Sequence, residues 1–425
     1  MQVIINPGVP EGIIHPPTSK SMMQRACAGA LLHRGTTTVI NPAGSKDDLA
    51  ALDIIQQLGA HVSVVNQNEI KIVSNGSPQA TPVINCGESG LCARMFTPIV
   101  SLLQAQVVVS GHGSLLHRPM NEVNDILSQL GVTLPHFNGY LPITIQGPLQ
   151  PRSLHVDGTS SSQYLTGLLI ALTATAQTVV TIDVTNLQSR PYIDLTLDVL
   201  SQFGKPVAHT DYRLFTIDPS SFFRKENISI VIDADWSSAA YWLVAAAIGG
   251  SLRVNNLSAK SFQADKAIID VLLSTGANVV VDQGSISVTH GHQLSSFVYD
   301  ATHSPDLFPI LAILAVACSG TSHIKGLSRL IHKESNRTAS ISHMLTAFGV
   351  SFEVDGDTLR VAGQCKLHAT TVDSHGDHRI AMAAAIGALN AAGPVIIHNA
   401  QAVSKSYPQF FSHLASLGIN LESKH

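Results

Sequence analysis

The lysines and arginines of this 425-residue chain gather in a few short polar segments. Only 13% of the residues are charged, and nine of the 25 basic residues lie in or beside turns rich in serine, glycine and aspartate. Arginine binds phosphate or carboxylate through paired hydrogen bonds, and each charge-assisted bond contributes about 1.5–3 kcal/mol. This placement predicts a site for a small polyanion, and the sequence has no Walker-type loop to hold a nucleotide. The nine residues are Lys20, Arg25, Arg94, Arg118, Arg190, Lys333, Arg337, Arg379 and Lys405.

Six repeated units must position these residues. Six segments with apolar residues three or four apart each end in a glycine, and these glycines are 72, 73, 72, 73 and 69 residues apart. That spacing of apolar residues predicts an amphipathic helix, and glycine suits the helix end because it adopts left-handed backbone without strain. The regular spacing predicts an α/β protein built from repeats of about 70 residues, each with short strands. The glycines are Gly59, Gly131, Gly204, Gly276, Gly349 and Gly418.

Six further helical stretches alternate with these and are apolar nearly all round, so they are expected inside the domains. Most begin with a polar or small cluster, which capping of the helix start would explain. Capping does not require the neighbouring lysines and arginines. If the buried helices run parallel, their positive ends converge on one surface and attract an anion. The stretches begin at Ser21, Gly90, Ser161, Ser237, Asp306 and Asp377.

Ten of these motifs, in order from about residue 15 to about residue 410, resemble the EPSP synthase (3-phosphoshikimate 1-carboxyvinyltransferase) family of enolpyruvyl transferases. Any one of them alone would be weak evidence, whereas ten in register are specific. They are Ser19-Lys20-Ser21 with Arg25, Gly87-Glu88-Ser89-Gly90 with Arg94, Arg118-Pro119, Ser161-Ser162-Gln163, Ser189-Arg190-Pro191-Tyr192, Asp235 with Ser237-Ser238, Asp306, Lys333-Glu334-x-x-Arg337, Asp377-His378-Arg379, and Ser404-Lys405.

The resemblance implies an enolpyruvyl transferase fold, an inside-out, barrel-like α/β arrangement. Two similar domains each contain three βαβαββ-type units around buried parallel helices. Residues 19–232 would form one domain, residues 1–18 with 233–425 would form the other, and the active site would lie in the cleft between them. The family transfers the enolpyruvyl group of phosphoenolpyruvate to the 5-hydroxyl of shikimate 3-phosphate and releases phosphate. It uses neither a metal nor an organic cofactor, and its members act as monomers.

The resemblance also assigns residues to each substrate and to catalysis. Asp306 is expected to be the base at the hydroxyl, Glu334 to move the proton at the methylene carbon, and Lys20 and Lys405 to donate to the departing phosphate. Phosphoenolpyruvate would be bound by Lys20, Gly90, Arg118, Gln163, Arg337, Arg379 and Lys405. Shikimate 3-phosphate would be bound by Lys20, Ser21, Arg25, Ser161, Ser162, Gln163, Ser189, Tyr192, Asp306, Arg329 and Lys333.

Other interpretations of the same residues stay open. Asp306 could only cap a helix, and Lys333 with Glu334 could be a solvated charge run. The histidines around Asp377 resemble a metal cluster but lack a further ligand, so we expect no metal. The sister enzyme UDP-N-acetylglucosamine enolpyruvyl transferase uses a cysteine just before the arginine that matches Arg118, and residues 111–117 contain none. A catalytically idle binding protein of the same fold would not need the acid and the base.

Three residues near the phosphoenolpyruvate motif depart from the usual family pattern: Glu88 for asparagine, Leu91 for threonine and Met95 for proline. Glu88 should weaken anion binding unless Arg94 or Arg118 pairs with it. The family is the target of glyphosate, which occupies the phosphoenolpyruvate site. We therefore expect glyphosate inhibition to be reduced but not abolished.

Composition excludes several other classes. The net charge of −4 provides no basic field for nucleic acid. Mean hydropathy is +0.22, but the most apolar stretch, residues 380–397, contains Asn390 and Pro394 and is better explained as a core helix and a strand than as a membrane span. No secretory signal follows Met1, and the five cysteines form no Cys-x-x-Cys pair. Free thiols in the cytoplasm are the expectation.

Overall fold

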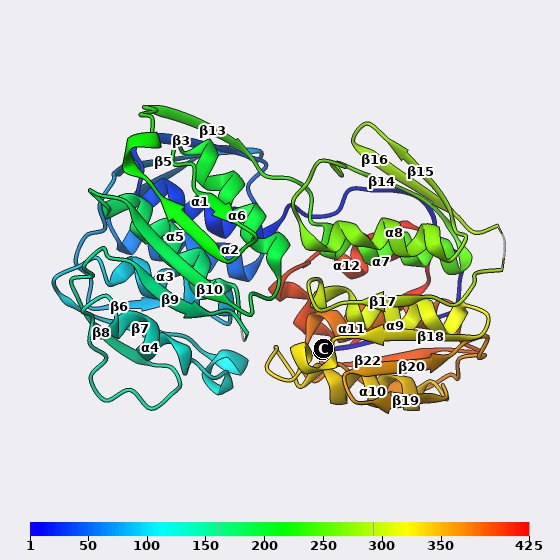
Figure 1. Ribbon diagram of the computed structural model, residues 1–425. Coiled ribbons are helices and arrows are strands. Elements are labelled where there is room, and N and C mark those ends of the chain that lie inside the picture. Colours follow the sequence, from blue (N-terminus) through cyan, green and yellow to red (C-terminus); the bar gives the residue numbers. More distant parts are fainter. Residues whose placement is uncertain (160, 292, 425) are drawn as a thin grey trace. The chain divides into compact units, whose positions relative to one another are not determined.

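The computed structural model describes residues 1–159, 161–291 and 293–424. The chain divides into two compact units, which we call the first unit (Thr18–Ile232) and the second unit (Met1–Pro17 with Asp233–His425). Each unit contains three small sheets and three buried helices (Figure 1).

The first unit builds its sheets in the orders β13-β3-β5-β4, β6-β7-β8 and β11-β12-β10-β9. Its buried helices are α1 (Lys20–Leu31), α3 (Gly90–Val100) and α5 (Gln163–Thr175), and α3 packs against both of the others. The outer helices are α2 (Lys46–Gln57), α4 (Glu122–Ser128) and α6 (Arg190–Gln202), with short 3-10 helices η1 (Gly113–His117) and η2 (Pro219–Ser221). The strands are β3 (Arg34–Ile40), β4 (His61–Asn66), β5 (Glu69–Asn75), β6 (Val83–Asn85), β7 (Gln106–Ser110), β8 (Ile143–Gln146), β9 (Leu154–Asp157), β10 (Val180–Thr185), β11 (Ala208–Thr210), β12 (Leu214–Ile217) and β13 (Asn227–Val231).

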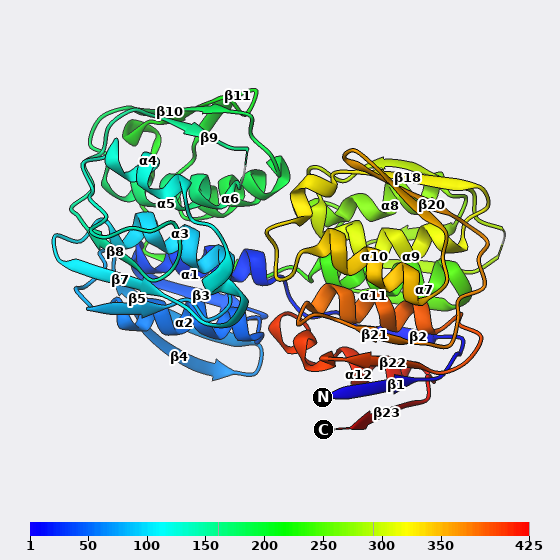
Figure 2. The same cartoon turned by 90° about the horizontal axis from the view of Figure 1, so that it is seen from below.

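The second unit has sheets of order β15-β16-β14-β2, β17-β18-β20-β19 and β21-β22-β1-β23. Its buried helices α7 (Trp236–Gly249), α9 (Phe308–Ala317) and α11 (His378–Ala388) all pack against one another (Figure 2). The outer helices are α8 (Ile268–Ser274), α10 (Arg337–Ala347) and α12 (Phe410–Ser416), with 3-10 helices η3 (Ala264–Ala267), η4 (Pro305–Leu307), η5 (Leu327–Leu330) and η6 (Ala400–Lys405). The strands are β1 (Gln2–Ile5), β2 (Glu11–Ile14), β14 (Ser251–Asn255), β15 (Asn278–Asp282), β16 (Ser285–Thr289), β17 (Val298–Asp300), β18 (Thr321–Lys325), β19 (Phe352–Asp355), β20 (Thr358–Ala362), β21 (Thr371–Asp373), β22 (Val395–His398) and β23 (Leu421–Lys424).

One strand pattern repeats in the sheets. In each four-stranded sheet one pair is parallel and the other two pairs are antiparallel, as in β9 parallel to β10, which is antiparallel to β12. The three-stranded sheet follows the same pattern, with a bridge between Thr133 and Gln146 where the fourth strand would run. The predicted six α/β units are thereby confirmed.

The helix ends also follow the prediction. The six glycines that close the outer helices all have positive φ, between 75° and 96°. Side chains of Ser19, Ser89 and Asp235 accept hydrogen bonds from the first turns of α1, α3 and α7. Helices α3 and α9 are buried along nearly their whole length, as expected for apolar helices inside a domain. Leu49 on α2 is an exception: it has the spacing expected of the apolar face of this outer helix, yet it is 56% exposed.

The most apolar stretch forms helix α11 followed by strand β22, as predicted. Among the described residues, none of the helices combines the length and apolar character that crossing a membrane would require. The cysteines are free: Cys27, Cys86, Cys92 and Cys318 are buried, and Cys365 is partly exposed. Burial raises the pKa of the Cys27 thiol well above its ordinary value, which keeps it protonated and unreactive.

Candidate active site

Asp306 lies at the centre of a charged cluster in the second unit. Its Oδ1 accepts a hydrogen bond from Arg337 Nη1 at 2.7 Å, and its Oδ2 accepts one from Arg379 Nη2 at 2.9 Å. Lys333 Nζ is 3.7 Å from Oδ1. Asp306 sits in η4, just before the buried helix α9, where its carboxylate pairs with arginines of neighbouring segments. Asp306 is therefore not only a helix cap.

Asp377, which is fully buried, joins this cluster to helix α11. Its Oδ1 accepts from the backbone N–H of Arg379 at 2.9 Å and so caps the helix, as its position in the sequence predicted. Its Oδ2 accepts from Arg337 Nε at 2.7 Å and from Ser335 Oγ at 3.2 Å. The sequence assigned no site function to this carboxylate. The second contact spans 40 residues and has no local sequence pattern.

Glu334 and Lys405 lie at the edges of the same cluster. Glu334 pairs with Arg337 three residues later, and Lys405 Nζ donates to the carbonyl of Gly376 at 3.0 Å. Arg337 is only 1% exposed, and its guanidinium contacts three carboxylates, those of Asp306, Glu334 and Asp377. The Lys333–Glu334 segment is a packed ionic network, so its interpretation as a solvated charge run was wrong.

Opposing effects set the protonation of this cluster. Burial alone would raise the pKa of Asp306, but Arg379, Lys333 and Arg337 outweigh it and hold that pKa well below its usual range. Burial lowers the pKa of Lys333 from 10.5 to about 8, although Asp306 opposes the change. Burial also lowers the pKa of Arg329, which lies in η5. Asp306 is therefore a carboxylate in the free protein, and Lys333 loses its charge at a lower pH than an ordinary lysine, with a pKa of about 8.

In the first unit, Arg25 is held by neutral groups. It lies on α1 and is 1% exposed. Its Nε donates to Thr196 Oγ1 at 2.9 Å, its Nη1 donates to the carbonyl of Ser21 at 2.7 Å, and its Nη2 donates to the carbonyl of Tyr192 at 3.2 Å. Burial lowers its pKa to about 10. A buried arginine whose bonded partners are neutral favours an incoming anion.

Lys20 opens the same helix and pairs with a carboxylate that the sequence did not single out. Lys20 Nζ is 2.9 Å from Asp47 Oδ2, and both side chains are largely buried. Asp47 lies in the first turn of α2. Ser21 follows Lys20 on α1, so the predicted Ser19-Lys20-Ser21 motif lies at the N-terminal end of this buried helix.

Two arginines lie against Gly90, where α3 begins. A β-carbon added at Gly90 would lie 2.6 Å from Arg118 Nη1 and 3.0 Å from Arg94 Nη1. Arg94 Nη1 donates to Gln163 Oε1 at 3.2 Å, which links α3 to the start of α5. Arg94 thus links Gly90, Arg118 and Gln163, three of the residues predicted for phosphoenolpyruvate. The Glu88 carboxylate accepts two hydrogen bonds, one from the backbone N–H of Ser114 and one from the Ser114 hydroxyl, both at 3.0 Å.

The remaining predicted residues of this unit lie at two helix starts. The Ser161 hydroxyl accepts from the Gln163 N–H at 3.1 Å, and Ser162 is buried at the N-cap position of α5. Ser189 takes the corresponding position on α6 with left-handed backbone, φ 56°, and Tyr192 lies in the first turn of that helix. These side chains stand at helix N-termini, where anions are favoured.

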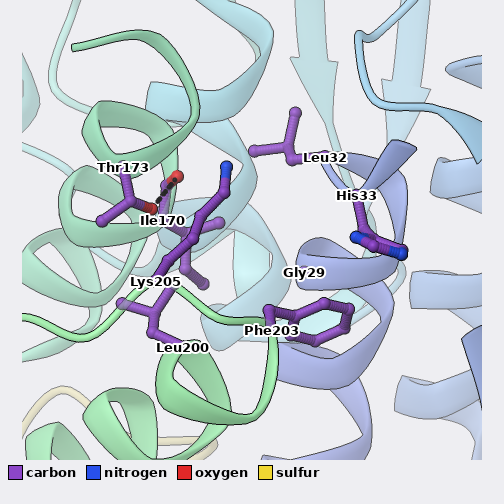
Figure 3. Close-up of a pocket in the computed structure, with 8 residues that line it drawn as sticks. All are labelled: Gly29, Leu32, His33, Ile170, Thr173, Leu200, Phe203 and Lys205. Carbon is purple, nitrogen blue, oxygen red and sulfur yellow. Dashed lines mark hydrogen bonds between the residues drawn. The ribbon is translucent and has the colours of Figure 1, made fainter. Parts of the chain in front are cut away.

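A small pocket in the first unit lies away from these residues. The pocket is open to solvent, has a volume of about 240 Å³ and lies at the C-terminal end of α1 (Figure 3). Lys20 lies at the other end of this helix, about 15 Å away. Burial lowers the pKa of Lys205, which lines it, to about 8. We therefore do not assign the substrates to this pocket. It is lined by Gly29, Leu32, His33, Ile170, Thr173, Leu200, Phe203 and Lys205.

Comparison with solved structures defines the class of protein. The enolpyruvyl transferase NikO from Streptomyces tendae superposes with a TM-score of 0.80 at 18% identity, covering 99% of this chain and 98% of that chain. An EPSP synthase from Acinetobacter baumannii superposes with a TM-score of 0.83 at 24% identity, covering 99% and 100%. The fold is therefore that of the enolpyruvyl transferases.

Sequence comparison defines the family. The family model of EPSP synthase (3-phosphoshikimate 1-carboxyvinyltransferase) matches residues 6–414. A 3-phosphoshikimate 1-carboxyvinyltransferase of Clostridium novyi is 34% identical, with 97% of each chain covered, and one of Aeropyrum pernix is 34% identical over 99% of this chain and 97% of that protein. The chain belongs to the EPSP synthase family.

Proposed function

We propose that this protein transfers the enolpyruvyl group of phosphoenolpyruvate to the 5-hydroxyl of shikimate 3-phosphate and releases inorganic phosphate, as a step of aromatic amino acid biosynthesis. The observation that carries the proposal is the Asp306 carboxylate held between Arg337 and Arg379 beside Glu334. A site for this reaction needs cations for anionic substrates and two carboxylates for proton transfer. Both requirements are met within one cluster.

The reaction proceeds by addition and then elimination. The 5-hydroxyl oxygen bonds to C2 of phosphoenolpyruvate as the hydroxyl proton passes to Asp306, and C3 gains a proton from Glu334. In the second step C3 returns a proton to Glu334, and the bond from C2 to the phosphate oxygen breaks, which restores the double bond. The hydroxyl proton held by Asp306 passes to the departing phosphate. Lys20 and Lys405 stabilise the charge on the departing phosphate.

Substrate binding prepares Asp306 for its role as a base. Arg337 and Arg379 hold the pKa of Asp306 low in the free protein, and a carboxylate with so low a pKa accepts a proton poorly. The carboxylate and phosphate of phosphoenolpyruvate compete for the same guanidinium groups. As the arginines turn to the substrate, the pKa of Asp306 rises and its basicity increases.

Most of the groups proposed for shikimate 3-phosphate lie in the first unit, and Asp306, Arg329 and Lys333 of the second unit complete the proposed set. Buried or helix N-terminal positions are occupied by Arg25, Ser162 and Ser189. The bonded partners of Arg25 are hydroxyl and carbonyl groups, so an anion can bind Arg25 without displacing a carboxylate from it. We propose that both sets of residues act on the same pair of substrates. We further propose that the protein acts as a cytoplasmic monomer, in line with its free thiols and its family.

The test is a phosphate-release assay with shikimate 3-phosphate and phosphoenolpyruvate. Turnover is expected in the wild type, with kcat lowered at least 100-fold in Asp306→Asn and little change in the affinity for shikimate 3-phosphate. Asp300→Asn, on an exposed carboxylate of β17, is the matched control and should not alter turnover. Turnover only with UDP-N-acetylglucosamine would assign the sister activity, and intact binding without turnover would indicate an idle binding protein. Undiminished turnover in Asp306→Asn would show that the base lies elsewhere.

A further inference from the structure

Two exposed histidines of the second unit face each other outside the cluster around Asp306. His343 lies on α10 and His375 lies in the turn before α11, 32 residues further along the chain. His343 Nδ1 and His375 Nε2 are 3.4 Å apart, and the ring centroids are 5.5 Å apart. Both residues are exposed, so a solute can reach the pair.

The separation of the two nitrogens fits one tetrahedral metal ion. Zinc binds imidazole nitrogen at about 2.0–2.1 Å, and two such bonds at the tetrahedral angle place their nitrogens about 3.3–3.4 Å apart. The turn is held in place on the opposite side, since the His375 N–H donates to Asp373 Oδ1 at 2.7 Å and Asn399 Nδ2 donates to the same oxygen at 2.9 Å. The Asp373 carboxylate also adds negative charge beside the pair, which favours a cation.

We propose that His343 and His375 bind a divalent transition-metal ion of the zinc type, with water completing the coordination. Among the described residues the structure shows no cluster of three or more histidine, cysteine, aspartate or glutamate side chains suited to a metal. The site is thus a two-ligand surface site of moderate affinity, unlike a structural zinc centre. Neither histidine is among the residues proposed for the enolpyruvyl transfer reaction.

The bound ion clamps α10 to the turn before α11. The same turn provides the Gly376 carbonyl that accepts from Lys405, and Asp377, which follows it, pairs with Arg337 at the start of α10. The ion therefore adds a second connection between two segments that the Arg337–Asp377 pair already joins. We expect it to raise the stability of the second unit by mass action.

Zinc titration of the full-length protein by isothermal calorimetry at pH 7.5 tests the site. His343→Gln and His375→Gln should each weaken the tightest zinc site at least tenfold, and the double variant should lose no more than either single variant, because two ligands are needed together. His61→Gln, on an exposed histidine of β4 in the first unit, is the control and should leave the isotherm unchanged.

Cobalt absorption spectra of the same proteins provide a second measurement that does not depend on heat. The wild type should show a band of nitrogen-coordinated cobalt that both histidine variants lose. If the zinc isotherms and cobalt spectra of the two variants match those of the wild type, the proposal is wrong. A wild type that shows neither a tight zinc site nor the cobalt band refutes it equally. The two rings then form only a hydrogen-bonded pair.

Discussion

Replacing Asp377 by asparagine tests whether this buried carboxylate positions Arg337. Asparagine is nearly isosteric with aspartate and caps helices equally well, so the hydrogen bond to the Arg379 N–H should persist. The charge that faces Arg337 Nε at 2.7 Å is lost. The variant thus separates the ionic function of Asp377 from its capping function.

The expected cost follows from the partners that remain. Breaking a fully buried ion pair typically costs 3–5 kcal/mol. Arg337 retains Asp306 and Glu334, which compensate part of its charge. We therefore expect the free energy of unfolding to fall by about 2–3 kcal/mol. Asp377→Ala, which also loses the cap, should cost about 1 kcal/mol more.

Urea unfolding at pH 7 measures this change, and steady-state kinetics measure the effect on the site. A misplaced Arg337 should raise the KM for phosphoenolpyruvate at least tenfold and the KM for shikimate 3-phosphate much less. Asp282→Asn, on an exposed carboxylate at the end of β15, is the control and should change neither stability nor KM. A loss of stability under 1 kcal/mol with unchanged KM values would refute the assignment of Asp377 as a positioning residue.

Three further predictions concern single positions or a pair. Because burial lowers the pKa of Lys333 to about 8, the KM for shikimate 3-phosphate should rise above pH 8 in the wild type and stay flat to about pH 9.5 in Lys333→Arg, as a pH series of initial rates would show. Burial lowers the pKa of Lys205 in the folded protein from 10.5 to about 8, so unfolding takes up a proton between pH 8 and pH 10.5 and the free energy of unfolding rises with pH over this range. Lys205→Met should raise the free energy of unfolding at pH 7 by roughly 1–3 kcal/mol and abolish its rise between pH 8 and pH 10.5, as urea unfolding at several pH values would show. Leu91→Thr with Met95→Pro should lower the inhibition constant of glyphosate, at a cost in stability of up to about 3 kcal/mol because proline removes a bond inside α3; an unchanged inhibition constant would contradict this.

Periodic features of the fold could be predicted from the sequence because their causes are local. A glycine at the end of a helix and an aspartate at its start act on backbone groups within four residues, and the spacings of the six glycines show how often the unit recurs. Leu49 shows the limit of this reasoning. Its spacing fits the apolar stripe of α2, but which positions a sheet covers depends on packing between elements, and here Leu49 faces solvent.

The types of the site residues could be predicted, but their partners could not. Asp47 pairs with Lys20 across 27 residues and Asp377 pairs with Arg337 across 40, and neither separation has a sequence pattern. His343 and His375 were likewise not recognisable as a pair. These contacts form when the start of one helix packs beside another, so they depend on the tertiary fold.

These partners determine what each cation can do. In the second unit, Arg337 and Arg379 already bind carboxylates, so an anionic substrate must displace Asp306 and gains only the difference between two ion pairs. In the first unit, the bonded partners of Arg25 are hydroxyl and carbonyl groups, and an anion there gains a full charge-assisted interaction. The sequence alone does not distinguish arginines paired with carboxylates from an arginine bonded to neutral groups. The structure distinguishes an arginine with neutral partners from arginines paired with a carboxylate. In the proposed reaction an incoming anion releases that carboxylate, Asp306, which then serves as the base.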